Sequence, residues 1–145
     1  MVVGDWNGDG WIDVATTSGA PRAVDIYWNQ GNGQLAGHQQ IVLASTPAEL
    51  MAGDFNADGK LDLATVAQTF AAPDELHLLM NDGAGNFSDA QPAGFALADD
   101  VRGLAAPVAN RLACTGLSDF VTTSLENVGQ YYGVGFARKL DNLSQ

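Results

Sequence analysis

One ten-residue pattern occurs twice in this chain, at a separation of 49 residues. It has the form G-D-[aromatic]-N-x-D-G-x-x-D and covers residues 4–13 and again residues 53–62. Each copy carries oxygen side chains at alternate positions and a Gly (Gly10 or Gly59) where the backbone must turn sharply. A tightly curled loop can point such side chains at one centre, and Gly accepts the positive φ that a Cβ would penalise. We therefore interpret the two copies as cation-binding loops in a repeat protein.

The oxygen-rich composition of the loops favours calcium. Ca²⁺ takes about six to eight oxygen ligands at about 2.3–2.6 Å, with carboxylates to balance its charge. The predicted ligands are Asp5, Asn7, Asp9, Asp13 and the Trp11 carbonyl in the first loop, and Asp54, Asn56, Asp58, Asp62 and the Lys60 carbonyl in the second. We expect two Ca²⁺ ions, because Mg²⁺ prefers few carboxylates and a rigid octahedron. Plain Asp/Asn/Gly turns between strands are the alternative interpretation.

Helical calcium-binding motifs do not fit the residues that follow the loops. An EF-hand needs a bidentate Glu at its twelfth position, where this chain has Thr16 and Thr65. The segments 14–17 and 63–66 are rich in β-branched residues and predict strands rather than helices. Helical dockerin-type repeats are excluded on the same ground.

Length and charge narrow the class of protein further. The chain has 145 residues, 17 of them Gly, and a formal net charge of −11. This describes one turn-rich, all-β domain. Two Ca²⁺ ions would reduce the net charge to about −7, which would still repel nucleic acid and anionic membrane surfaces. We expect neither nucleic-acid binding nor membrane insertion, and Cys114, the only cysteine, cannot form an internal disulfide.

The two loops belong to repeat units of four short strands. We divide the chain into a first unit at residues 1–47 with a truncated first strand, a second at 48–97, and a degenerate, incomplete third at 98–145. In the first two units the loop is followed by a strand, an alternating strand and a Gly-rich hairpin, N-x-G-x-G-x-[apolar], at residues 29–35 and 81–87. In the third unit Asp119 occupies the place of Asp13 and Asp62, but residues 107–117 contain no acid. We expect no cation there.

This combination of loop and hairpin resembles the FG-GAP, or VCBS, repeat, the blade unit of integrin α-subunit propellers and of many secreted bacterial proteins. The resemblance is good over residues 1 to about 97 and is confined to the region of Asp119 in the third unit. It implies a calcium-stabilised β-propeller of four-stranded antiparallel blades, with the ions at the loops. The chain holds about two and a half to three blades and cannot close a ring alone. Missing blades of a parent chain, or self-association, are therefore possible partners.

The sequence shows no catalytic constellation, so we expect a binding protein rather than an enzyme. There is no Gly-x-Ser-x-Gly motif, His38 and His77 are isolated, and Cys114 has no His nearby in sequence. Carboxylates that saturate a calcium ion leave little for acid–base chemistry. The leading hypothesis is a calcium-binding module of a secreted or cell-surface protein that takes part in protein or carbohydrate interaction and adhesion. A lectin, or an accessory segment of a larger extracellular hydrolase or lyase, are the alternatives.

Aromatic residues supply the candidate contacts for a ligand. Trp6 and Phe55 occupy the same loop position and are predicted to pack in the core. Trp11 aligns with Lys60, which predicts an exposed position. Exposed aromatics can stack on sugar rings or anchor a protein partner. The other candidates for this role are Tyr27, Tyr131 and Tyr132.

Overall fold

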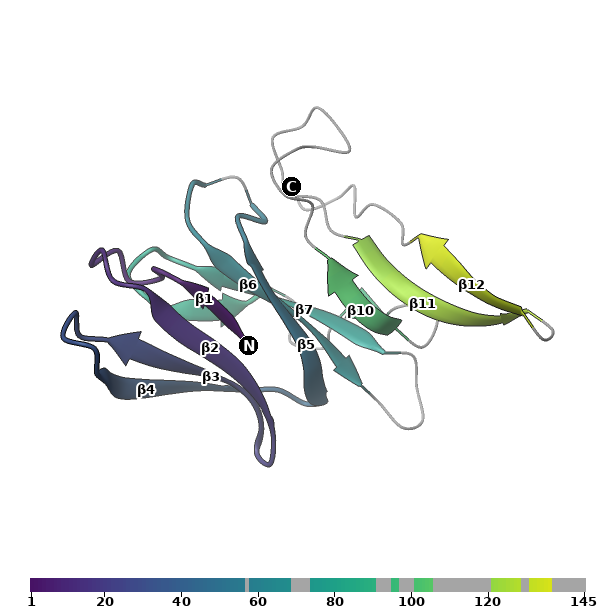
Figure 1. Cartoon of the computed structure of the whole chain (residues 1–145), viewed down its shortest axis with the longest axis horizontal. Helices are drawn as coiled ribbons and strands as arrows, with labels where there is room; N and C mark the ends of the chain where they lie inside the picture. Colours follow the sequence, from purple (N-terminus) through teal and green to yellow (C-terminus); the bar gives the residue numbers. More distant parts are fainter. Residues whose placement is uncertain are drawn as a thin grey trace.

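The chain folds into three antiparallel sheets arranged in sequence order (Figure 1). The computed structural model describes residues 1–56, 58–68, 74–90, 95–96, 101–105, 121–128 and 131–136. Within these ranges there is no helix, and hence none long and apolar enough to cross a membrane. The predicted all-β class is confirmed.

The first two sheets are meanders of four strands. The first sheet has the order β1 (Val2–Gly4), β2 (Asp13–Gly19), β3 (Arg22–Asn29) and β4 (Leu35–Val42). The second has β5 (Thr46–Gly53), β6 (Asp62–Gln68), β7 (Glu75–Asn81) and β8 (Phe87–Asp89), and β9 (Phe95–Ala96) also pairs with β7. The third sheet contains β10 (Val101–Ala105), β11 (Val121–Val128) and β12 (Tyr131–Phe136). Four-stranded antiparallel sheets of this kind are the predicted propeller blades.

The two complete sheets repeat the same register at the loops. Gly4 pairs with Asp13 in the first sheet, and Gly53 pairs with Asp62 in the second. Each ten-residue pattern therefore closes between two paired strands, at one end of its sheet. At that same end lie the hairpins 29–35 and 81–87, because they join β3 to β4 and β7 to β8. Loop and hairpin thus form one surface in each sheet.

The core lies between neighbouring sheets. One apolar cluster joins Trp6, Ala15, Val24, Ile26 and Leu43 of the first unit to Leu63 and Leu79 of the second. A second cluster lies on the opposite face of the second sheet and contains Met51, Phe55, Ala64, Val66, Leu76 and Leu78. On that side β10 contacts β5 and β6. The second sheet is therefore covered on both faces, and Trp6 and Phe55 are buried as predicted.

Candidate metal centre

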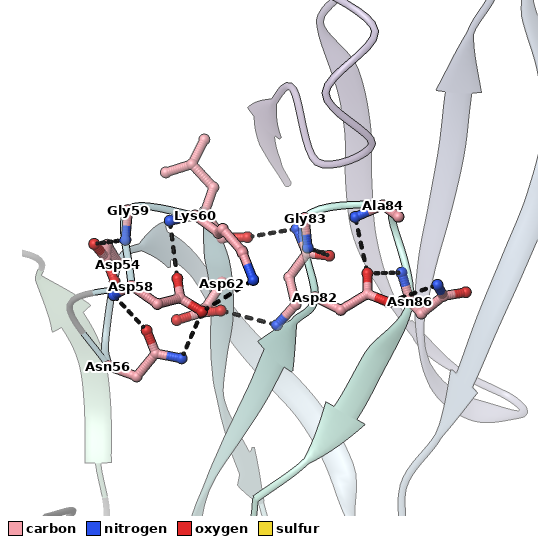
Figure 2. Close-up of polar contacts among 12 residues, drawn as sticks. Asp54, Asn56, Asp58, Gly59, Lys60, Asp62, Asp82, Gly83, Ala84 and Asn86 are labelled. Atoms are coloured by element: carbon pink, nitrogen blue, oxygen red, sulfur yellow. Dashed lines mark hydrogen bonds and ion pairs between the residues drawn. The ribbon is translucent and has the colours of Figure 1, made fainter.

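In the second loop, side-chain oxygens accept hydrogen bonds from the loop's own backbone N–H groups (Figure 2). The Asp54 carboxylate accepts hydrogen bonds from the backbone N–H of Asp58, at 3.1 Å, and of Gly59, at 2.8 Å. Asn56 Oδ1 accepts from Asp58 N at 2.9 Å, and Asp58 Oδ1 accepts from Lys60 N at 2.9 Å. Gly59 has a φ of 84°, which an L side chain would adopt only with strain. The alternate spacing of the oxygens thus matches the curl of the backbone.

The first loop repeats these contacts. The two oxygens of Asp5 accept from Gly8 N and Gly10 N, both at 2.9 Å. Asn7 Oδ1 accepts from Asp9 N at 3.0 Å, and Asp9 Oδ1 accepts from Trp11 N at 2.8 Å. Two segments that share the oxygen spacing but differ at the x positions therefore adopt the same curl.

The last Asp of each pattern is fully buried and ties the loop to the hairpin. Asp13 accepts from Trp6 N at 3.2 Å and from Asn29 N at 2.9 Å. In the second loop Asp62 accepts from Phe55 N at 3.0 Å and from Asn81 N at 2.8 Å. Because each carboxylate bonds the start of its own loop and the end of the third strand, it has a structural role that the ligand assignment alone does not predict.

Asn29 and Asn81 are the first residues of the hairpins. Their side chains complete this buried connection between loop and hairpin, which we call the joint. Asn29 Nδ2 donates to Ile12 O at 2.9 Å, and Asn81 Nδ2 donates to Leu61 O at 3.0 Å. Asn81 Nδ2 also lies 2.9 Å from Trp6 O, so it joins the second hairpin to the first loop. The signal in the sequence is the repeated N of the hairpin motif, although that motif by itself indicates only a turn.

The three carboxylates of each loop repel one another. Burial raises the pKa of Asp13 above its usual value, backbone hydrogen bonds from Asn29 and Trp6 oppose this, and the charges of Asp9 and Asp5 raise it further. Asp62 has a raised pKa for the same reasons, with Asp58 and Asp54 as the repelling charges. A cation in either loop would relieve this repulsion.

The donor set fits a hard divalent cation. The side chains predicted as ligands supply only oxygen, and a carboxylate oxygen that accepts one N–H retains a second lone pair. In the ranges with described side chains, no three His, Cys, Asp or Glu groups are gathered as a metal cluster. Calcium binding at the two loops stays a prediction, carried by the chemistry of the donors.

The loops differ at the residue predicted to donate a carbonyl. Trp11 is 50% exposed, as predicted, and its ring lies against the backbone of Gly31. Lys60 lies over Gly83, where a Cβ would come within 2.9 Å of Lys60 Cδ. Its Nζ is 3.5 Å from Asp58 Oδ2. The second loop therefore contains a cationic side chain of its own.

The remaining candidate residues lie away from the loops. His77 Nδ1 is 2.9 Å from Asp89 Oδ2, and His38 Nε2 is 2.8 Å from Asp25 Oδ1. The half-buried ring of Tyr27 stacks on His38 at 4.9 Å between ring centroids. Cys114, Asp119 and the side chains of Tyr131 and Tyr132 lie outside the described residues.

Comparison with known proteins agrees with the repeat pattern. The family model of the FG-GAP-like repeat matches residues 5–65, which begin at the first Asp of the first loop and end in β6. No curated protein and no solved structure matches the chain. Residues 5–65 are therefore similar to the FG-GAP-like repeat, and the antiparallel four-stranded sheets agree with propeller blades built from such repeats.

Proposed function

We propose that the chain is a calcium-binding propeller-blade module that acts by binding a protein or a glycan, outside the cell or on its surface. The observation that carries the proposal is the repeated loop, in which two carboxylates and one amide oxygen accept hydrogen bonds from a Gly-hinged backbone and the charges of those carboxylates raise the pKa of the buried Asp13 or Asp62. A divalent cation would offset that repulsion and hold the loop against the buried joint at Asp13 or Asp62. Millimolar extracellular calcium would fill sites of modest affinity.

Binding rather than catalysis is supported by the way the ionisable groups are used. The loop carboxylates accept backbone N–H groups, and His38 and His77 are each held by an aspartate on a sheet face. An accessory role beside an extracellular hydrolase or lyase would use the same surface for attachment. In neither role does this chain supply a catalytic group.

A lectin is the second candidate, and Trp11 favours it. Its indole is half-exposed and lies against Gly31, in a hairpin whose other residues include Asn29, Gln30 and Asn32. A fixed aromatic face on an amide-rich hairpin is a surface on which a sugar ring can stack and hydrogen-bond. A glycan array probed with the parent chain and with Trp11→Ala tests this candidate, because a lectin would lose its signal in the variant.

Calcium binding is tested by thermal unfolding with calcium, with magnesium and with chelator. A site with a Kd of about 10–100 μM would gain roughly 1.4–2.7 kcal/mol of unfolding free energy per site at about 1 mM calcium. Replacing Asp54 and Asp58 with Ala should remove one ion in a calorimetric titration, and replacing Asp5 and Asp9 should remove the other. Equal stability with calcium and chelator, and no titration heat, would overturn the proposal.

A further inference from the structure

Lys60 and Trp11 occupy equivalent places but carry different charge. Lys60 lies over Gly83 and Trp11 lies over Gly31, each in the Gly-rich hairpin of its own unit. The hairpin backbone therefore holds each side chain near its loop. In the second loop this brings an ammonium group to 3.5 Å from Asp58 Oδ2. In the first loop an uncharged indole takes the equivalent place. The charge of the second loop is thus partly neutralised before any ion arrives.

The second hairpin offers the Lys60 ammonium another carboxylate. Figure 2 shows Lys60 between the loop and the hairpin that carries Asp82. Asp82 is held by Asn86 Nδ2 at 2.7 Å and Ala84 N at 2.8 Å. Its pKa is lowered by hydrogen bonds from Asn86 and Ala84 and, more weakly, by the charge of Lys60. The first hairpin has the neutral Gln30 at this position. Lys60 and Asp82 are therefore a pair of charges that the second unit has and the first lacks.

We propose that Lys60 is a resident competitor for the second cation site, which makes the two loops unequal. A calcium ion entering the second loop must displace the ammonium from Asp58, and Asp82 receives it. The first loop binds calcium without this exchange. The inference rests on the proposed calcium binding, whose ligands in the second loop include the carboxylate that Lys60 contacts.

The expected difference in affinity follows from the charges involved. A fixed ammonium about 5 Å from a divalent ion would weaken binding by roughly 15-fold if the two charges interacted as in bulk water, and by more at the lower effective dielectric constant of a protein surface. If the ammonium moves away, the loss is that of an exposed ion pair, which is about fivefold or less. Because the proposal has the ammonium move to Asp82, we expect calcium to bind the first loop up to about fivefold more tightly than the second.

Isothermal titration with calcium alone tests the inference in single-site backgrounds. Asp54→Ala with Asp58→Ala isolates the first loop, and Asp5→Ala with Asp9→Ala isolates the second. In the second background Lys60→Met keeps the stem and the main-chain carbonyl but removes the charge, so affinity should rise by up to about fivefold. In the first background Trp11→Lys should lower affinity by a similar factor. Asp82→Asn should weaken the second loop a further few-fold, but only while Lys60 is present.

The results distinguish a failure of the competitor role of Lys60 from a failure of calcium binding itself. If both loops bind calcium with equal affinity and Lys60→Met changes nothing, the competitor role is wrong and calcium binding stands. If neither loop binds calcium in the parent, both fail. Thermal melts of each variant in chelator show whether folding is intact, and Lys60 is exposed enough that Lys60→Met should melt with the parent.

Discussion

The first and second sheets share a pattern but not an environment. In β2 only Asp13 and Ala15 are buried, whereas six consecutive residues of β6, from Asp62 to Ala67, are buried. The sequences DVATTSG and DLATVAQ differ at four of seven positions, two on each face, so sequence alone does not account for the difference in burial. Thr65 is fully buried while the equivalent Thr16 is not. Burial of a repeat thus depends on its neighbours as much as on its own residues.

A polar pair on this face shows the same dependence. Asp25 and His38 in the first sheet hold the register positions of His77 and Asp89 in the second, with acid and base exchanged. The second pair lies in the interface, where His77 is fully buried, and Ser45 Oγ donates to the neighbouring Glu75 at 2.7 Å. The first pair lies on the open face. The repeat therefore keeps an acid–histidine pair while exchanging the residues that form it.

The largest expected effect comes from the buried joint of the second sheet. Asp62→Ala leaves the N–H groups of Phe55 and Asn81 without their acceptor. An unsatisfied buried donor costs about 1–3 kcal/mol, so we expect a loss of roughly 2–4 kcal/mol in urea unfolding. Asp13→Ala should cost about 1 kcal/mol less, because Asn29 lies where water can reach it.

Asp62→Asn is the matched control for this prediction. It retains one acceptor oxygen and removes the charge, so its stability should fall between that of the parent and that of Asp62→Ala. If Asp13→Ala lost more unfolding free energy than Asp62→Ala, the cost of removing the buried Asp would not depend on how the neighbouring sheet covers it.

The sequence predicted the repeat, the strands and the buried aromatics because these depend on local pattern. Period-two alternation and the Gly-hinged loops are properties of neighbouring residues, and Trp6 and Phe55 share one motif position. The contacts that the sequence did not predict join residues on different strands or different sheets. Asn81 Nδ2 reaches Trp6 O across 75 residues, and His77, isolated in the sequence, pairs with Asp89 on the next strand. One residue identity does not determine which distant carbonyl or carboxylate lies opposite.

The contact of Trp28 with the second hairpin provides an intermediate effect. Gly85 has a φ of 84°, and a Cβ there would come within 2.8 Å of Trp28 Cη2. Gly85→Ala should therefore cost about 1–2 kcal/mol for the backbone, with a further ~1 kcal/mol for moving the indole. The measurement is urea unfolding followed by tryptophan fluorescence.

Gly33→Ala separates the backbone cost from the cost of moving the indole. Gly33 has a φ of 81°, and no atom lies within 4 Å of the place that an added methyl group would take, so only the backbone cost applies. We expect it to lose about 1 kcal/mol less than Gly85→Ala. Equal losses would mean that the contact between the sheets at Trp28 contributes little.

The smallest expected effect concerns the pair on the open face. Burial raises the pKa of Asp25, but hydrogen bonds from Gln40, Ser18 and His38 outweigh it and hold the pKa below the ordinary value of 3.8. The unfolded chain therefore binds a proton more readily than the folded one. The contribution of Asp25 is present above about pH 4 and disappears as the pH falls through the lowered folded value. Asp25→Asn should lose up to about 1 kcal/mol at about pH 6, and the gap to the parent should narrow towards about pH 3 in urea unfolding. A gap that widened on acidification would reverse the sign and show that desolvation, rather than hydrogen bonding, dominates at the open face.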